Sequence, residues 1–188
     1  MEPEVGEHRD RLLHGLRGRV LEIGAGNGVN FSRYPESVEE VVALEPEPFL
    51  RAKAEQAARR ARVRISVRAG VAAPLPFAAE SFDAAVACLV LCTVPDLRAA
   101  LAELRRVLKP DGELRFLEHV RSTTYAKAAV QRAFDGSGLW PLFGGGCHCS
   151  RATTAAIGEG GFRVTELEEI TFGPSWFITN PHLRGVAR

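Results

Sequence analysis

The chain has 188 residues, of which 46% are hydrophobic and 25% are charged. We expect a single globular domain over residues 1–188, because this length and composition exclude a disordered, collagen-like or coiled-coil protein. The 24 Lys and Arg residues nearly balance the 23 Asp and Glu residues, and the net charge of +1 argues against a nucleic-acid partner.

The cysteines and the start of the chain predict the compartment. The first ten residues are rich in charge, and no apolar run approaches the roughly 20 residues of a membrane span. We therefore expect a cytoplasmic protein without a membrane anchor, in which the four cysteines are reduced.

Strand-like and helix-like segments alternate along the chain. Apolar or alternating runs predict strands at 19–23, 40–45, 63–68, 82–91, 113–118, 162–167 and 183–186. Composition and leucine spacing predict helices at 49–61, 96–108 and 125–134, the second ended by residues 109–112. This alternation predicts an α/β fold with right-handed crossovers, a doubly wound, mostly parallel seven-stranded Rossmann-like sheet and helices on both faces.

Residues 136–150 interrupt this pattern. The segment is long and rich in glycine, with an apolar middle that contains Trp140 and Phe143. Loops of this length are usually functional or disordered. We interpret the segment as a lid over a binding site, although docking on a partner subunit or completion of the core are alternatives.

The turn after the first predicted strand has features of a nucleoside site. Alternating glycines in residues 24–28 allow a tight turn and a close approach to backbone amides. The dinucleotide fingerprint fits poorly, because Val29 stands where a third small residue is needed. Glu22 before the turn favours a cationic ligand over a pyrophosphate, and Glu45 after the second strand can accept both hydroxyls of a ribose. These features suggest S-adenosylmethionine (SAM), a nucleoside with a positive group and no phosphate.

Several blocks resemble one known family. Residues 20–28 (VLEIGAGNG) resemble motif I of the class I SAM-dependent methyltransferases, with Glu45 as their ribose acid. Residues 75–77, 81–83 and 104–112 are similar to the downstream blocks of the ubiquinone- and menaquinone-type enzymes. Further similarity, in residues 88–94, 117–120 and 146–151, is to the thiol methyltransferases of vertebrates. Those relatives begin with an apolar membrane anchor, which we do not expect in this chain.

The resemblance implies SAM as the cofactor and S-adenosylhomocysteine (SAH) as its product. It implies the following cofactor-binding residues: Glu22, Gly24, Ala25, Gly26, Asn27, Gly28, Asn30, Glu45, Pro46, Val71, Ala72 and Leu89. Val71 stands where the family usually has an acid that meets the adenine amino group. We therefore expect adenine to be held by backbone groups near Ala72 and by apolar contact with Pro46 and Leu75.

Methyl transfer from a sulfonium needs a nucleophile with a lone pair, aligned with the methyl group. A thiol is a few per cent thiolate at neutral pH and so needs little activation. His119 after a predicted strand and His148 in the lid are the candidate catalytic residues, and a His119 satisfied by backbone carbonyls is the alternative. The candidate substrate-binding residues are Trp140, Phe143, Cys147, Arg151 and Trp176.

The cysteine spacing argues against a metal. Cys147 and Cys149 are too close for a zinc ribbon or finger half-site, and Cys88 and Cys92 belong to an apolar strand and its exit. We therefore expect no metal.

The sequence leaves alternatives for the methyl acceptor and for the oligomeric state. A small, rather apolar thiol is the leading acceptor, and methylation at oxygen, nitrogen or carbon of a small metabolite is the alternative. A catalytically silent nucleoside-binding module is the non-enzyme alternative. We expect a monomer or a homodimer.

Overall fold

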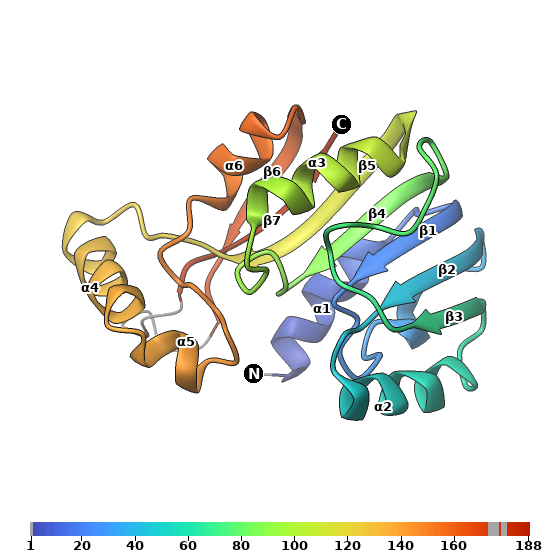
Figure 1. Ribbon diagram of the computed structural model, residues 1–188, viewed down its shortest axis with the longest axis horizontal. Helices are drawn as coiled ribbons and strands as arrows, with labels where there is room; N and C mark the ends of the chain where they lie inside the picture. Colours follow the sequence, from blue (N-terminus) through green and yellow to red (C-terminus); the bar gives the residue numbers. More distant parts are fainter. Residues whose placement is uncertain (1, 173–176, 178–179) are drawn as a thin grey trace.

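The computed structural model describes residues 2–172, 177 and 180–188. In this part of the chain, seven strands form one sheet in the order β3-β2-β1-β4-β5-β7-β6 (Figure 1). The strands are β1 (Gly18–Ile23), β2 (Val38–Leu44), β3 (Arg64–Arg68), β4 (Phe82–Cys88), β5 (Leu108–His119), β6 (Val164–Ile170) and β7 (His182–Ala187). The helices are α1 (Glu2–Leu13), η1 (Phe31–Arg33), α2 (Pro48–Ala58), α3 (Leu97–Val107), α4 (Tyr125–Gly136), α5 (Leu139–Phe143) and α6 (Thr153–Glu159).

The sheet is parallel from β3 to β5 and antiparallel where β7 pairs with β5 and β6. The predicted doubly wound, mostly parallel α/β fold is therefore confirmed. The strand order reverses between β1 and β4, and ligands of such folds bind beyond the carboxyl ends of the strands at this point. The loops after β1, β2, β4 and β5 therefore define where a site can form.

Alternating side chains of the central strands divide the core into two layers. Val20 packs in one layer with residues of α1 and α2, whereas Leu21 packs in the other with residues of α3 and α6. Val41 and Val42 of the neighbouring strand divide in the same way. Because successive residues of a strand point to opposite faces, a strand buried on both sides reads as a continuous apolar run.

Helices α1, η1, α5 and α6 were not predicted, and several strand boundaries differ from the sequence-based expectations. The strand predicted at 82–91 ends at Cys88, and the strand predicted at 162–167 runs over Val164–Ile170. Helix α1 was not predicted, because charged residues outnumber the few apolar ones, such as Leu12 and Leu13, that it buries. Helices α5 and α6 are too short for a periodic pattern to reveal them. Residues 109–112, predicted as a turn after a helix, lie within β5 at an irregular register opposite β4. None of the described helices is both long and apolar enough to cross a membrane.

A substitution at Gly185 in β7 tests how closely the antiparallel edge of the sheet is packed. A Cβ there would lie 2.5 Å from the Phe116 ring and 2.6 Å from the backbone oxygen of Glu166. We expect Gly185→Ala to lower the free energy of unfolding by about 1–3 kcal/mol, measured by urea denaturation, because neither neighbour can move freely. The control Gly158→Ala adds a Cβ to α6 where nothing lies within 4 Å, and should be neutral or slightly stabilising. Equal effects of the two substitutions would contradict this account of the packing.

Candidate active site

The loop between β1 and η1 presents a backbone surface at the reversal of strand order. Gly24, Gly26 and Gly28 all have positive φ, at 62°, 58° and 79°. A Cβ on Gly24 would lie 2.2 Å from the side chain of Val90, and one on Gly28 would lie 2.8 Å from the Phe31 ring. Glycine is therefore required at these two positions both by conformation and by space.

Glu45 joins the end of β2 to this loop. Its Oε2 atom accepts a hydrogen bond of 2.8 Å from the Gly26 N–H, and its Oε1 atom accepts one of 3.0 Å from the Glu47 N–H. Each carboxylate oxygen has two acceptor positions, so both retain capacity for a ligand hydroxyl. The structure thus places the predicted ribose acid against the predicted glycine loop.

Glu118, a residue that we did not predict, fixes the loop after β4. It is fully buried, and its carboxylate accepts hydrogen bonds from the backbone N–H groups of Val90, Leu91 and Cys92 at 2.9, 2.8 and 3.2 Å. Burial raises the pKa of Glu118, although these three donors favour the carboxylate. An acidic residue at the end of a buried strand is the sequence signal that could have identified this role.

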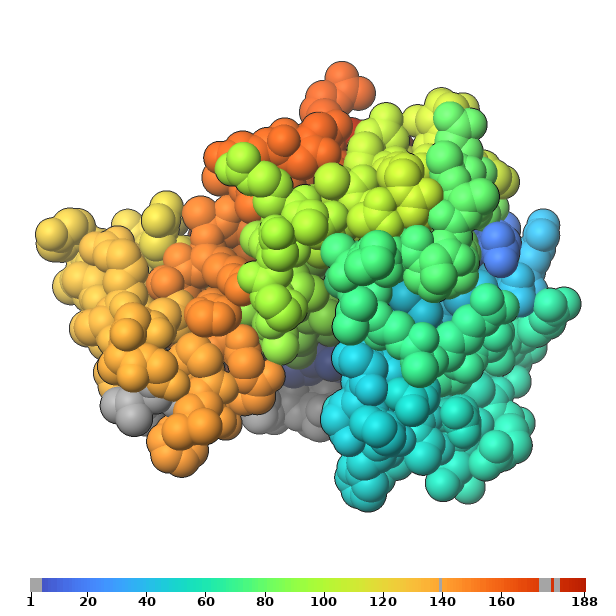
Figure 2. Space-filling view, in the orientation of Figure 1, coloured from blue at the N-terminus to red at the C-terminus, as the bar shows by residue number. Residues whose placement is uncertain are grey.

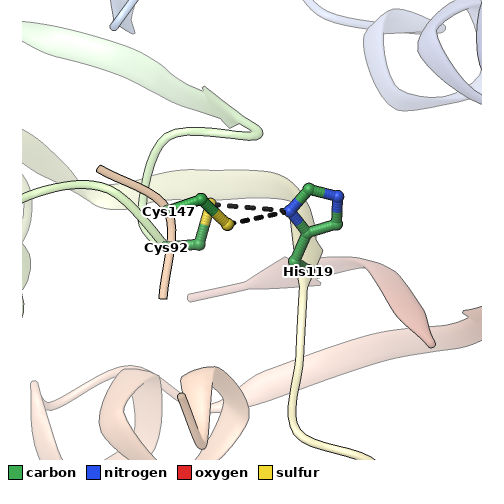
Figure 3. Close-up of side chains that lie close together, drawn as sticks. All are labelled: Cys92, His119 and Cys147. Carbon is green, nitrogen blue, oxygen red and sulfur yellow. Dashed lines mark hydrogen bonds between the residues drawn. The ribbon is translucent and has the colours of Figure 1, made fainter. Parts of the chain in front are cut away.

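A group of three side chains, which we call the Cys-His cluster, lies beside this loop: Cys92, His119 and Cys147 (Figure 3). His119 Nδ1 is 3.2 Å from Cys147 Sγ and 3.8 Å from Cys92 Sγ. The three residues come from the loop after β4, the end of β5 and the predicted lid. The cluster and the glycine loop therefore lie at the same edge of the sheet, where Figure 2 shows a hollow between the α5 segment and the start of α2.

Comparison with known proteins identifies the family of the chain. Residues 21–116 match the family model described as "Methyltransferase domain". The chain is 34% identical over 173 residues to the thiol S-methyltransferase TMT1B of Rattus norvegicus, a match that covers 89% of this chain and 69% of that protein.

The chain is a SAM-dependent methyltransferase. A further relative, the thiol S-methyltransferase TMT1A of Homo sapiens, is 32% identical over 173 residues, with 89% of this chain and 69% of that protein covered. Among solved structures, a geranyl diphosphate methyltransferase in complex with SAM superimposes with a TM-score of 0.74. That match covers 99% of this chain and 84% of the other at 14% identity, and so it shows the fold alone.

Glu22 of β1 hydrogen-bonds to residues that follow the glycine loop. It is buried, and its two oxygens accept hydrogen bonds from Asn30 Nδ2 at 2.7 Å and from the Tyr34 hydroxyl at 2.8 Å. Arg9 donates to Asn30 Oδ1 at 2.8 Å. Burial raises the pKa of Glu22 to about 7, against the lowering effect of Asn30, Tyr34 and Arg9. The structure thus gives Glu22 and Asn30 a part in a buried network, and their contact with SAM stays a prediction.

The other predicted cofactor residues surround the same edge. Leu89, with φ of 57°, begins the loop that Glu118 fixes. Asn27, Pro46 and Val71 are exposed on the loops after β1, β2 and β3, while Ala25 is buried and Ala72 is half-buried. Their contacts with the cofactor stay predictions.

The two thiols of the Cys-His cluster differ in acidity. The hydrogen bond from the Cys92 thiol lowers the pKa of Cys147 to about 5, and contact with His119 adds to this effect. The same hydrogen bond, together with burial, raises the pKa of Cys92 far above its ordinary value. Cys147 is therefore the more acidic thiol of the pair.

His182 of β7 packs against His119 of the Cys-His cluster. It pairs with His119 across the antiparallel strands, and the centroids of the two rings are 4.3 Å apart. Burial, with smaller contributions from His119 and His8, lowers the pKa of His182 to about 3. A neutral imidazole thus packs behind His119. This pair was not predicted, because the two residues are far apart in the chain.

The predicted lid is attached to the loop after β4. The His148 N–H donates to the Cys92 carbonyl at 2.8 Å, and the Arg151 guanidinium donates to the Leu91 carbonyl at 2.6 Å. Trp140 is half-buried and its indole contributes to the lowered pKa of Cys147. Phe143 is 81% exposed, and its contact with the acceptor stays a prediction. Trp176 lies outside the described residues.

The raised pKa of Glu22 predicts a pH-dependent contribution to stability. Between pH 4.5 and about 7, the folded chain retains a proton on Glu22 that the unfolded chain has released, so this residue's contribution falls as pH rises. A shift of this size corresponds to about 3 kcal/mol. Gln can accept from Asn30 and donate to Tyr34, so Glu22→Gln should gain stability relative to the unaltered chain across this window and show no further gain above it. Urea denaturation at several pH values measures this difference, and a difference independent of pH would contradict it.

Proposed function

We propose that this methyltransferase transfers the methyl group of SAM to the sulfur of a small, rather apolar thiol. The observation that carries the proposal is the position of the Cys-His cluster at the cofactor edge, within a chain whose relatives are named thiol S-methyltransferases. A cytoplasmic location, and assembly as a monomer or a homodimer, stay predictions.

The reaction is an in-line displacement. A lone pair of the acceptor sulfur forms a bond to the methyl carbon while the bond from that carbon to the sulfonium breaks, and the electron pair of the broken bond stays on the sulfur of SAH. The acceptor proton is released, so a thiol and SAM give a methyl thioether, SAH and a proton. The protein's main contribution is alignment of the two sulfurs, which is worth up to about 7–11 kcal/mol in favourable systems.

We assign different parts of the cofactor to different loops at this edge of the sheet. We assign the ribose hydroxyls to Glu45, whose two carboxylate oxygens already hold the Gly26 and Glu47 amides. The adenine then falls near Pro46 and Ala72, on the loops after β2 and β3, which is consistent with their exposed and half-buried positions. This arrangement directs the other end of the cofactor toward the loop after β4.

The acceptor lies on the side of the predicted lid. Cys147 and Trp140 belong to a segment that is held against the loop after β4 by hydrogen bonds from the His148 N–H and the Arg151 guanidinium. An apolar thiol can contact the indole of Trp140 while its sulfur faces His119. His148 and Phe143 stay predicted contacts of the acceptor.

A panel of acceptors with labelled SAM tests the proposal. An alkyl thiol should be methylated at least tenfold faster than a phenol, a quinol or an amine of similar size. Near neutral pH a thiol is a few per cent anionic, whereas a phenol is about 0.1% anionic and an amine is protonated and has no free lone pair. Product formation is measured by chromatography of the labelled methyl group. Methylation of a phenol or quinol without methylation of any thiol would contradict the proposal.

A pair of variants links the activity to the cofactor site. Glu45→Ala should lose most of its affinity for SAH in calorimetry and most of the activity, because the ribose loses its acceptor. The matched control Glu39→Ala removes an exposed carboxylate from the same strand and should change neither.

A further inference from the structure

We propose that Cys92, His119 and Cys147 bind one Zn²⁺ ion and that the acceptor thiol completes the coordination as a thiolate. This inference replaces the metal-free site that the cysteine spacing predicted. The sequence-based argument considered Cys147 together with its neighbour Cys149. In the folded chain, Cys147 lies instead beside Cys92, which is 55 positions earlier in the sequence.

The distances fit a tetrahedral ion. With Zn–S and Zn–N bonds of about 2.3 and 2.05 Å, tetrahedral geometry separates a sulfur from a nitrogen by about 3.6 Å. His119 Nδ1 lies 3.2 and 3.8 Å from the two sulfurs, values on either side of this figure. All three ligand atoms lie within 4.8 Å of one another, so a zinc ion can reach each of them with small side-chain rotations.

The donor set selects the metal. Two thiolates and an imidazole suit zinc, whereas magnesium and calcium prefer oxygen ligands. The remaining cysteines of the chain have other partners, because Cys149 Sγ contacts Asp135 and Cys88 Sγ accepts from Arg9.

Backbone contacts hold the ligands in place before any ion binds. The Cys92 N–H donates to Glu118 and the Cys92 carbonyl accepts from the His148 N–H. On the opposite side, the Cys147 N–H donates to the Gly144 carbonyl at 3.1 Å. Such preorganisation is typical of sites built to keep a fixed geometry.

The described cluster supplies three ligands, which leaves one tetrahedral position for another group. Zinc sites with three protein ligands and one open position are typically catalytic. A thiol that coordinates a metal ion loses its proton, so the ion would supply a thiolate acceptor.

The Cys-His cluster adjoins the residues that pack against the glycine loop. Val90, whose side chain packs against Gly24, is two residues before Cys92. The thiolate lone pair would attack the methyl carbon, the sulfonium bond would break toward SAH, and the proton lost on coordination would go to solvent. His119 then acts as a ligand, in place of the general base that the sequence predicted. The acceptor part of this inference rests on the proposed thiol methylation, whereas the metal site does not.

Metal binding is tested on the 188-residue chain freed of metal by a chelator. Titration with Zn²⁺ should give one equivalent bound, measured by elemental analysis after gel filtration, and Co²⁺ should give the visible bands of a tetrahedral ion with thiolate charge transfer. Cys92→Ser and His119→Ala should lose this binding, while Cys149→Ser, which removes a buried thiol outside the cluster, should retain it. Failure to bind either metal, with SAH binding intact, would overturn the inference.

The role of the ion is tested with an alkyl thiol. Adding the thiol should shift the cobalt spectrum, and removing zinc should slow methylation at pH 6.5 by up to about 100-fold, since only about 1% of a thiol with a pKa near 8.5 is ionised there. An unchanged spectrum and an unchanged rate would overturn the role of the ion in activating the acceptor. Zinc binding with a thiol ligand but no methylated product would instead contradict the proposed function and leave the metal site standing.

Discussion

The buried carboxylate of Glu118 is the interaction on which the site depends. A carboxylate removed from water is costly unless hydrogen bonds compensate it, and here the backbone N–H groups of three consecutive residues do so. Because Glu118 lies in β5, the loop after β4 is attached to the neighbouring strand. Val90 is thereby placed against Gly24, and Cys92 is placed beside His119. The Glu118 interaction thus relates the position of the glycine loop to that of the Cys-His cluster.

Carboxylates at the ends of two other strands also accept hydrogen bonds from neighbouring segments. Glu45 after β2 accepts from the glycine-loop amide of Gly26, and Glu22 in β1 accepts from Asn30 and Tyr34 beyond that loop. The three carboxylates differ in the hydrogen-bond acceptor capacity that they leave for a ligand. Glu118 and Glu22 are fully buried and already accept hydrogen bonds from the protein, whereas Glu45, although only 6% exposed, keeps acceptor positions for a ligand.

The fold was predicted correctly from the sequence because it depends on local patterns, and the structure brings together the glycine loop and Glu45, which the sequence singled out. Apolar runs located the strands, and the spacing of Gly24, Gly26 and Glu45 indicated a nucleoside site beside the first strand. The Cys-His cluster, in contrast, depends on contacts between segments that are distant in the sequence. Cys92 looked like a core residue and Cys147 looked like part of a short cysteine pair, and only the pairing of β4 with β5 and the return of the lid bring them to His119. Neither periodicity nor local spacing carries that information.

A crystal structure of the chain with SAH and an alkyl thiol tests the central claim most directly. The account predicts ribose hydroxyls on the Glu45 carboxylate, and the thiol sulfur between the SAH sulfur and the Cys92–His119–Cys147 cluster. SAH seated on the glycine loop with its sulfur directed away from the cluster, or a thiol bound on another face of the domain, would contradict it.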